Sequence, residues 1–268
     1  MKAMEFNMEN KVDVEIIKIN GAGRDTIIDK VIREYPFTLY LNGHEIITLL
    51  CIPDSLQELA VGFLISEGFI DSFEEIDEME LDRDNGRIRI QGDMEDKPLR
   101  DRLRGKRTVT SGCGKGSSFY NVLDSSKSRK IDKIMGIEPQ TVIQLMREFN
   151  KYSGLFNETG GVHSCALCSR DSILVHRDDI GRHNALDKIL GWGHINGQDF
   201  SDKLVLTTGR ISSEMLIKTA KRGVPVVISR SAPTSLAVDL ARELNITLVG
   251  FARGEKMNIY TNFPSIDF

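Results

Sequence analysis

Cys113 is the side chain of this sequence best suited to nucleophilic chemistry. It lies in the glycine-rich segment 111–116 (SGCGKG), where the glycines allow another molecule to approach closely and Lys115 favours the thiolate. A thiolate attacks an activated sulfur atom to give a persulfide, whose outer sulfur then passes to an acceptor. The alternative is an inert loop cysteine, but an exposed free thiol is a liability without a use. We therefore predict that Cys113 receives and passes on a sulfur atom.

A second set of candidate residues follows three short apolar runs, at 204–206, 226–228 and 247–249. Runs at this regular spacing are typical of βαβ units in a buried parallel sheet, and the connection rules place their ends along one edge. Arginine guanidinium groups and helix N-termini at such an edge are suited to binding phosphate. Each run is followed by Ser or Thr hydroxyls or an arginine. The alternative is that these hydroxyls only cap helices and that the arginines reach solvent. We predict a pocket for a phosphate-bearing ligand, formed by Thr208, Arg210, Arg230, Ser231 and Arg253.

His163, Cys165 and Cys168 make up half of a zinc site by spacing. No second C-x-x-C or H-x₃-H follows to complete the four ligands of a structural site. Zinc deaminases also need H-x-E, and Cys165 stands where that glutamate would be. Zinc and a redox pair stay open as alternatives. Because apolar Ala166-Leu167 separate the thiols, the pattern favours a buried helical turn in which the cysteines pack.

Polar residues are crowded into the segment 178–188 (DDIGRHNALDK), at an expected strand-to-helix junction. Helix capping and surface charge explain part of this crowding. Arg182 and His183 exceed what a cap requires, since they can hold an anion or move a proton. We expect these two residues to belong to the functional site.

The first third of the chain predicts a small α+β unit over residues 1–105. Alternating residues 37–41 before Asn42-Gly43, and Asn85-Gly86 before 87–90, are hairpin signals. Between them, Ser55 with Glu58 predicts a capping box for a helix that ends near Gly68. We expect the charged residues of this unit, Glu67, Arg87 and Arg89, to be solvated.

The rest of the chain divides into a connection and a second domain. Periodicity fades over residues 106–136, and we expect a mobile connection that carries Cys113. Pro139 then begins a helix whose apolar stripe is Val142, Leu145, Met146 and Phe149. Residues 137–268 form the expected α/β domain, with a mostly parallel central sheet.

Composition points to a soluble globular protein. The net charge of −4 and the charged fraction of 28 % exclude a chain-wide surface for nucleic acid or membrane. No stretch approaches the ~18 apolar residues of a membrane span, and residues 1–10 have no signal-peptide core, so we expect a cytoplasmic protein. Four cysteines are too few for a disulfide scaffold. Cys51 lies between leucines and an isoleucine, so we expect it to pack in the hydrophobic core.

Five motifs follow one another along the chain: 111–114 (SGCG), 159–163 (TGGVH), 179–188 (DIGRHNALDK), 208–214 (TGRISSE) and 250–254 (GFARG). Residues 59–64 (LAVGFL) with Glu67-Gly68 add a sixth stretch. Together they resemble the FdhD family (FdhD/NarQ), the sulfur carriers required for formate dehydrogenase activity. The likeness covers nearly the whole chain, and ordered motifs are far more specific than any single one.

The resemblance implies a sulfurtransferase. A cysteine desulfurase would load sulfur on Cys113 as a persulfide, and the sulfur would pass to the bis(molybdopterin guanine dinucleotide) cofactor of molybdenum or tungsten, before insertion into formate dehydrogenase. It implies a homodimer and a cytidine-deaminase-like three-layer α/β fold without the zinc site. A guanine nucleotide would bind in the same place as the cofactor. The matching cofactor-binding stretch is Phe251, Ala252, Arg253, Gly254, Glu255 and Lys256.

The sequence differs from a common pattern of this family at one position. Many members of the family have C-x-x-C in the loop, whereas Gly116 stands at the second position here. Either Cys113 suffices alone, which we expect, or Cys165 or Cys168 acts as a resolving thiol. Two rival functions also stay open: a chaperone that binds the molybdenum cofactor without carrying sulfur, and a zinc-dependent deaminase.

Overall fold

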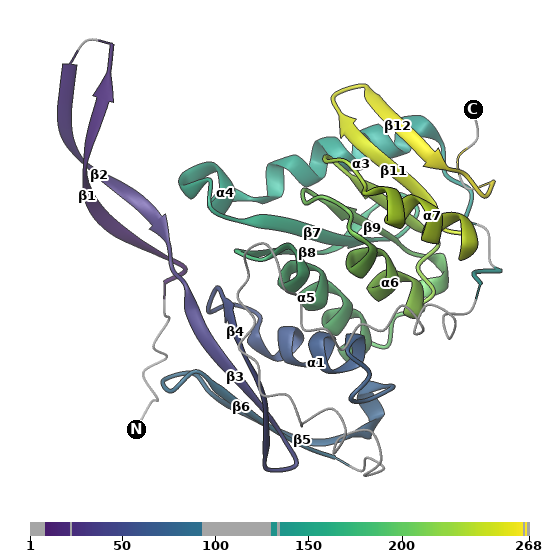
Figure 1. Cartoon of the computed structure of the whole chain (residues 1–268), viewed down its shortest axis with the longest axis horizontal. Coiled ribbons are helices and arrows are strands. Elements are labelled where there is room, and N and C mark those ends of the chain that lie inside the picture. The colour runs from purple at the N-terminus through teal and green to yellow at the C-terminus, as the bar shows by residue number, and fades with distance from the viewer. Residues whose placement is uncertain (1–8, 22, 93–129, 133–134, 265, 267–268) are drawn as a thin grey trace.

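The fold is described from a computed structural model, over residues 9–21, 23–92, 130–132, 135–264 and 266 (Figure 1). Two sheets make up the body, one with a single α-helix across it and the other with helices on both faces, and a long two-stranded ribbon projects from the body. Cys113 and most of the predicted connection 106–136 lie outside the described residues. The end of that connection is packed, because Ile131 donates its N–H to Leu244 O at 3.0 Å and Met135 is buried.

The N-terminal unit is a four-stranded sheet with one helix across it. The strand order is β4-β3-β6-β5, and both predicted hairpins are present. Asn42-Gly43 and Gly86 form the turns with positive φ, which glycine and asparagine tolerate. The elements are β3 (Tyr35–Leu41), β4 (His44–Cys51), α1 (Leu56–Ser66), the 3₁₀ helix η1 (Phe73–Glu75), β5 (Ile76–Asp82) and β6 (Arg87–Gly92).

Two expectations for α1 are wrong. Ser55 has a left-handed backbone (φ 53°) and its side chain caps nothing, so the predicted capping box is absent. Glu58 instead binds Arg177 of the second domain, with Arg177 Nε and Nη2 donating to its two oxygens at 2.5 and 2.6 Å. Glu67, expected to be solvated, lies 3.5 Å from Lys218 with its side chain only 11 % exposed. Both carboxylates join the domains rather than facing water.

The second domain has three layers around a six-stranded sheet. The strand order is β12-β11-β10-β9-β7-β8, and β9, β10 and β11 pair in parallel as predicted. The outer pairings are antiparallel. The strands are β7 (His163–Cys168), β8 (Ile173–Asp179), β9 (Leu204–Thr207), β10 (Val226–Ser229), β11 (Thr247–Arg253) and β12 (Lys256–Thr261).

Helices cover both faces of this sheet (Figure 1). One core cluster joins α5, α6 and α7 to Val205, Val227 and Leu248; the other joins α3 to Leu206 and Ile228. The alternation of side chains along each strand therefore builds two cores, which confirms the α/β fold class. The helices are α3 (Pro139–Tyr152), α4 (Gly154–Thr159), α5 (Arg182–Ile195), the 3₁₀ helix η3 (Phe200–Asp202), α6 (Ser213–Lys221) and α7 (Ser235–Glu243).

Helices α1 and α5 cross at two glycines, and this crossing joins the two units. A Cβ at Gly62 would lie 1.8 Å from Asp187 O, and one at Gly191 would lie 1.9 Å from Glu58 O. No side chain fits between backbones this close. The small residues are therefore required by the packing of α1 on α5.

The ribbon, β1 (Lys11–Asn20) with β2 (Gly23–Ile32), was not predicted from the sequence. Its ten residue pairs form one antiparallel hairpin that meets the body only near its base. The run 11–32 is mostly β-branched and charged residues, but apolar side chains fall on both faces, so it shows no clean alternation. The composition of this run favours strands, but its hydrophobic periodicity does not identify them.

The helix crossing yields a prediction for stability. Gly62→Ala should lower the free energy of unfolding by about 3 kcal/mol, because the added methyl group must push α5 away. Gly154→Ala is the matched control, since a Cβ there meets nothing within 4 Å; it should leave stability unchanged or raise it slightly. Urea denaturation of both variants measures the difference. Equal effects would contradict the proposed role of the crossing.

Candidate functional site

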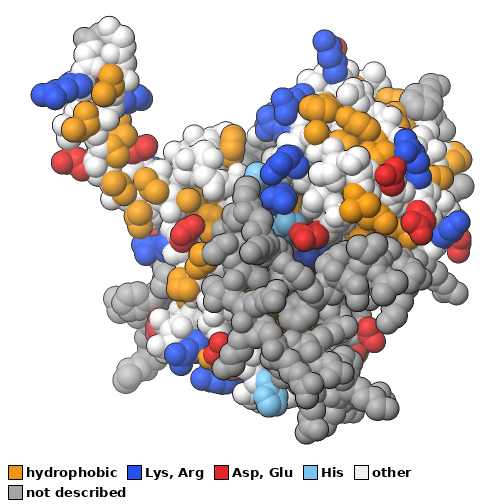
Figure 2. All heavy atoms as spheres, viewed as in Figure 1, with side chains coloured by type: hydrophobic (Ala, Val, Ile, Leu, Met, Phe, Trp, Pro, Cys, Tyr) orange, Lys and Arg blue, Asp and Glu red, His pale blue; other side chains and the backbone are white. Residues whose placement is uncertain are grey.

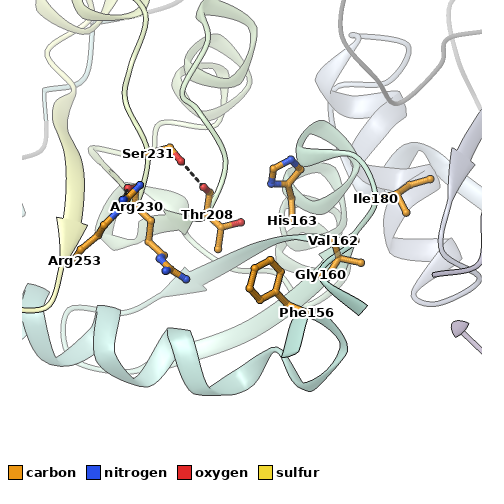
Figure 3. Close-up of a pocket in the computed structure, with 10 residues that line it drawn as sticks. Phe156, Gly160, Val162, His163, Ile180, Thr208, Arg230, Ser231 and Arg253 are labelled. Carbon is orange, nitrogen blue, oxygen red and sulfur yellow. Dashed lines mark hydrogen bonds between the residues drawn. The ribbon is translucent and has the colours of Figure 1, made fainter. Parts of the chain in front are cut away.

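A pocket of about 390 Å³ opens at the edge of the sheet where β9, β10 and β11 end (Figure 3). Its walls come from four connections: after α4, after β8, after β9 and after β10, with the end of β11 beside them. This is the edge that the sequence predicted for a ligand. The lining residues are Phe156, Gly160, Gly161, Val162, His163, Ile180, Thr208, Arg230, Ser231 and Arg253.

Two of the three predicted arginines meet in this pocket. Arg230 follows β10 and Arg253 ends β11. Arg253 Nε donates to Arg230 O at 2.7 Å, which leaves the terminal nitrogens of both guanidinium groups for a ligand. Two cations on one wall favour an anion such as a diphosphate.

The hydroxyls that the sequence singled out hold the loops together. Ser231 Oγ donates to Thr208 O at 2.8 Å (Figure 3). Thr208 Oγ1 accepts from Ser164 N at 3.0 Å, and its own O–H can still donate a hydrogen bond. Ser212 and Thr234 cap α6 and α7, as the alternative reading of these loops held. The first-turn N–H groups of these helices are therefore partly used by their own caps, and the pocket presents mainly side chains to a ligand.

His163 faces the arginines from the opposite wall (Figure 3). Burial lowers the pKa of His163 below its usual 6.5, and the nearby cations Arg182, His183 and Arg210 lower this pKa further. The imidazole is therefore neutral at pH 7, and it is able both to donate and to accept a hydrogen bond. An anion bound beside it would reverse the effect of the cations.

Arg182, His183 and Arg210 lie beside the pocket rather than among its lining residues. His183 Nε2 pairs with Glu214 at 3.2 Å, and this hydrogen bond lowers the pKa of Glu214. Arg210 is exposed. These three residues therefore act on the pocket through their charge, as their effect on His163 shows. Their predicted contact with a ligand stays a prediction.

The stretch Phe251–Lys256 contributes one lining residue, Arg253. Phe251 has a left-handed backbone (φ 53°), is 40 % exposed, and donates its N–H to Ser231 O at 3.2 Å. A non-glycine residue in this conformation is strained. Ala252 is buried, while Glu255 and Lys256 are exposed at the β11–β12 turn. Phe251 is therefore exposed and tied through its backbone to a lining residue, but it does not itself line the pocket.

Sequence reasoning missed the wall formed by α4 and the start of β7. Asp178 organises this wall: Ser164 Oγ donates to Asp178 Oδ1 at 2.6 Å, and Ser153 Oγ donates to Asp178 Oδ2 at 2.8 Å. Ser153 is also the N-cap of α4, whose Phe156 lines the pocket. The motif 159–163 (TGGVH) is the available signal, but it contributes only to the family resemblance, and the spacing of His163 from Cys165 and Cys168 suggests half of a zinc site, not the wall of a pocket.

Cys165 and Cys168 lie on strand β7, not on the predicted helical turn. Residues three apart on a strand point to opposite faces, and the two thiols indeed lie in different core clusters. Burial raises the pKa of Cys165 to about 12 and also raises the pKa values of Cys51 and Cys168. The pair therefore cannot close a disulfide or bind one metal together, and neither thiol suits a resolving role.

Among the residues described, no group of three or more His, Cys, Asp or Glu side chains is arranged to hold a metal ion. The same part of the chain contains no helix with the length and apolar composition needed to span a bilayer.

The comparison with known proteins decides the family. The model of the FdhD/NarQ family matches residues 32–267. The chain belongs to the FdhD/NarQ family. Among its relatives, sulfur carrier protein FdhD of Listeria monocytogenes serotype 4b is 43% identical, over 90% of this chain and 92% of the relative. The protein of the same description from Bacillus subtilis is 44% identical, over 87% and 89%.

A solved structure has the same fold. The protein described as a formate dehydrogenase accessory protein from Desulfotalea psychrophila superposes with a TM-score of 0.78 at 28% identity, over 94% of this chain and 97% of that one. The family resemblance read from the motifs is therefore confirmed.

The paired arginines lead us to expect that the pocket has an affinity for guanosine diphosphate. Arg230→Gln and Arg253→Gln should each weaken its affinity about tenfold, because each removes a charge-assisted hydrogen bond to phosphate. Arg242→Gln is the control, since Arg242 is exposed on α7 and pairs with Asp239. Isothermal titration calorimetry measures the three affinities. Equal affinities for wild type and the two pocket variants would refute this use of the pocket.

His163 predicts a pH dependence of the same binding. The free imidazole has a lowered pKa, and a bound diphosphate would raise it, so binding takes up a proton. The extra affinity should be fully present below the free pKa and lost as pH rises through the bound pKa. The ratio of wild-type to His163→Gln affinity, measured from about pH 5 to pH 8, cancels titration of the nucleotide itself. A ratio independent of pH would contradict the contact.

Proposed function

We propose that this chain is a sulfur carrier for formate dehydrogenase, and that it acts as a sulfurtransferase. Sulfur arrives from a cysteine desulfurase as a persulfide on Cys113 and passes to a bis(molybdopterin guanine dinucleotide) cofactor of molybdenum or tungsten held in the pocket. Membership of the FdhD/NarQ family and relatives described as sulfur carrier proteins support the carrier role.

The observation that carries the proposal is the pair of arginines at the sheet edge. Arg230 and Arg253 form a cationic wall opposite the neutral imidazole of His163. A guanosine diphosphate has two phosphates for this wall and a flat base for an aromatic ring such as Phe251 or Phe156. The chemistry of these side chains fits the nucleotide portion of the cofactor.

Size restricts what the pocket holds. A volume of about 390 Å³ is at the lower end for small-molecule sites, which suits one nucleotide arm of a cofactor that carries two. The rest of the cofactor would therefore lie outside the pocket, accessible to a sulfur carried by a separate segment. This arrangement gives the pocket the task of holding the acceptor and Cys113 the task of bringing sulfur to it.

The two sulfur transfers at Cys113 are exchange reactions. In the first, the Cys113 thiolate attacks the outer sulfur of the donor persulfide, a new S–S bond forms, and the donor thiolate leaves. In the second, an electron pair of the acceptor forms a bond to the outer sulfur, the S–S bond at Cys113 breaks, and its electron pair stays with the Cys113 sulfur. The acceptor thereby gains one sulfur atom and is formally oxidised by two electrons. The thiolate is regenerated, and no second cysteine is required.

The rival function is a chaperone that binds the cofactor without carrying sulfur. It uses the same pocket, and it differs only in needing no thiol. The homodimer implied by the family resemblance is compatible with either function and stays part of the proposal.

Loading of sulfur on Cys113 tests the proposal. After incubation with a cysteine desulfurase and cysteine, mass spectrometry should find one added sulfur atom on wild-type Cys113 and none on Cys113→Ala. The variant should also fail to restore formate dehydrogenase activity in a deletion strain.

Cys165→Ala/Cys168→Ala is the control for this test, and it should load sulfur and activate the enzyme like the wild type because both thiols are buried. Restoration of activity by Cys113→Ala would favour the chaperone. Loss of activity in the control variant, with its fold intact, would restore the resolving-thiol hypothesis.

A further inference from the structure

Phe156 is the most exposed apolar residue that lines the pocket. It is 43% exposed, whereas the other apolar lining residues, Val162 and Ile180, are buried and half-buried. Apart from the imidazole of His163, it carries the only aromatic ring among the described lining residues. A single exposed apolar residue on an open surface is ordinary. An aromatic ring left uncovered inside a concave site is different, because a ligand that covers it gains the free energy of its burial.

The backbone holds this ring in place. The N–H of Phe156 donates to Ser153 Oγ at 3.0 Å, and its carbonyl oxygen accepts from Gly160 N at 2.8 Å. Ser153 Oγ donates in turn to Asp178 Oδ2 at 2.8 Å, so the start of α4 is tied to strand β8. Both backbone hydrogen-bonding groups of Phe156 are therefore fixed before a ligand arrives, which reduces the entropy lost on binding.

The base of the ribbon supports the same wall. Lys11 of β1 forms an ion pair with Glu158 of α4. Ile32 of β2 packs on the connection after α4, where a Cβ at Gly161 would lie 2.9 Å from Ile32 Cγ2. The short helix that carries Phe156 is thus held at its start by Asp178 and at its end by the ribbon.

The ring of Phe156 faces the arginine wall. Figure 3 shows it directed toward the guanidinium group of Arg230, with Arg253 farther along the same wall. A nucleoside diphosphate carries its negative charge at one end and a planar base at the other. The two walls therefore offer one kind of partner to each end, cations to the phosphates and an aromatic face to the base.

Phe251 is the rival for this role. It is 40% exposed, but it does not line the pocket. It also lies on β11 two residues before Arg253, on the side of the pocket that the phosphates would occupy. The geometry therefore favours Phe156.

We propose that Phe156 is the stacking residue of the pocket, and that its ring covers one face of the guanine base while Arg230 and Arg253 hold the diphosphate. This inference rests on the proposed function, since it takes the pocket to hold a nucleotide arm of the cofactor. It adds an orientation, in which the nucleotide lies across the pocket from the arginine wall to α4. It also explains how the pocket prefers a nucleotide to phosphate alone, because stacking adds affinity for a base of any kind.

The test separates the base from the phosphates. Isothermal titration calorimetry on full-length variants measures affinity for guanosine diphosphate and for inorganic pyrophosphate. Phe156→Leu should weaken the binding of guanosine diphosphate at least about fivefold and that of pyrophosphate less than about twofold, because Leu keeps apolar bulk and helix propensity but lacks the flat ring. Phe156→Tyr keeps the ring and should bind both probes like the wild type. Tyr152→Leu is the control, at an exposed aromatic residue of α3 outside the pocket, and it should also match the wild type.

Fluorescence gives a second readout that a merely structural role would not change. Phe156→Trp adds an indole at the proposed stacking position, and the wild type, whose one tryptophan is Trp192, supplies the background. Guanosine diphosphate should quench the added fluorescence by stacking on the indole, and pyrophosphate should not.

The outcomes distinguish this inference from the proposed function. If Phe156→Leu binds guanosine diphosphate like the wild type, or loses affinity for both probes equally, the stacking inference is wrong. A loss confined to Phe251→Leu would also overturn it. In each case the proposed function stands if the wild type loads sulfur on Cys113. A wild type that shows the expected dependence on Phe156 but loads no sulfur would support the inference and overturn the sulfur-carrier role. A wild type that binds neither probe would overturn both the inference and the use of the pocket.

Discussion

Two adjacent carboxylates, Asp178 and Asp179, hold together the N-terminal unit, the start of α5 and one wall of the candidate site. The Asp179 side chain is fully buried, with Lys188 Nζ at 2.7 Å and donors from Ile52 N, Gly181 N and Asn184 Nδ2 around it. It therefore ties the N-terminal unit to the start of α5. A buried charge is stable only when it is paired and hydrogen-bonded, so removing Lys188 would leave an uncompensated ion. Asp178 faces the other way and holds the wall of the pocket through two serine hydroxyls.

This arrangement explains which parts of the sequence could be interpreted and which could not. Apolar runs at 204–206, 226–228 and 247–249 predicted the parallel strands, because burial on both faces leaves a local signal. Regular spacing then placed Arg230 and Arg253 together, since strand ends share one edge. The opposite wall of the pocket comes from antiparallel β7 and the short helix α4, and no local period indicates which strand lies beside which.

Residues that join the two units were the least predictable. Glu58 has the spacing of a capping box and Glu67 the look of a surface charge, yet both pair with cations from the second domain, Arg177 and Lys218. A carboxylate has the same sequence signature whether it is solvated or buried beside a partner more than a hundred residues away. The glycines of the α1–α5 crossing behave similarly, because nothing local distinguishes a close helix contact from a flexible position.

Burial also decides which sulfur atoms take part in chemistry. Cys51, Cys165 and Cys168 are all buried, and burial raises the pKa of each thiol. Because the thiolate is the nucleophile, these cysteines hold almost none of the reactive form near neutral pH. A protein that handles persulfide must prevent sulfur from migrating among its own thiols. Of the four cysteines in the chain, the fold withholds these three from exchange. In the proposed function, sulfur delivered to Cys113 would therefore have no competing acceptor among them.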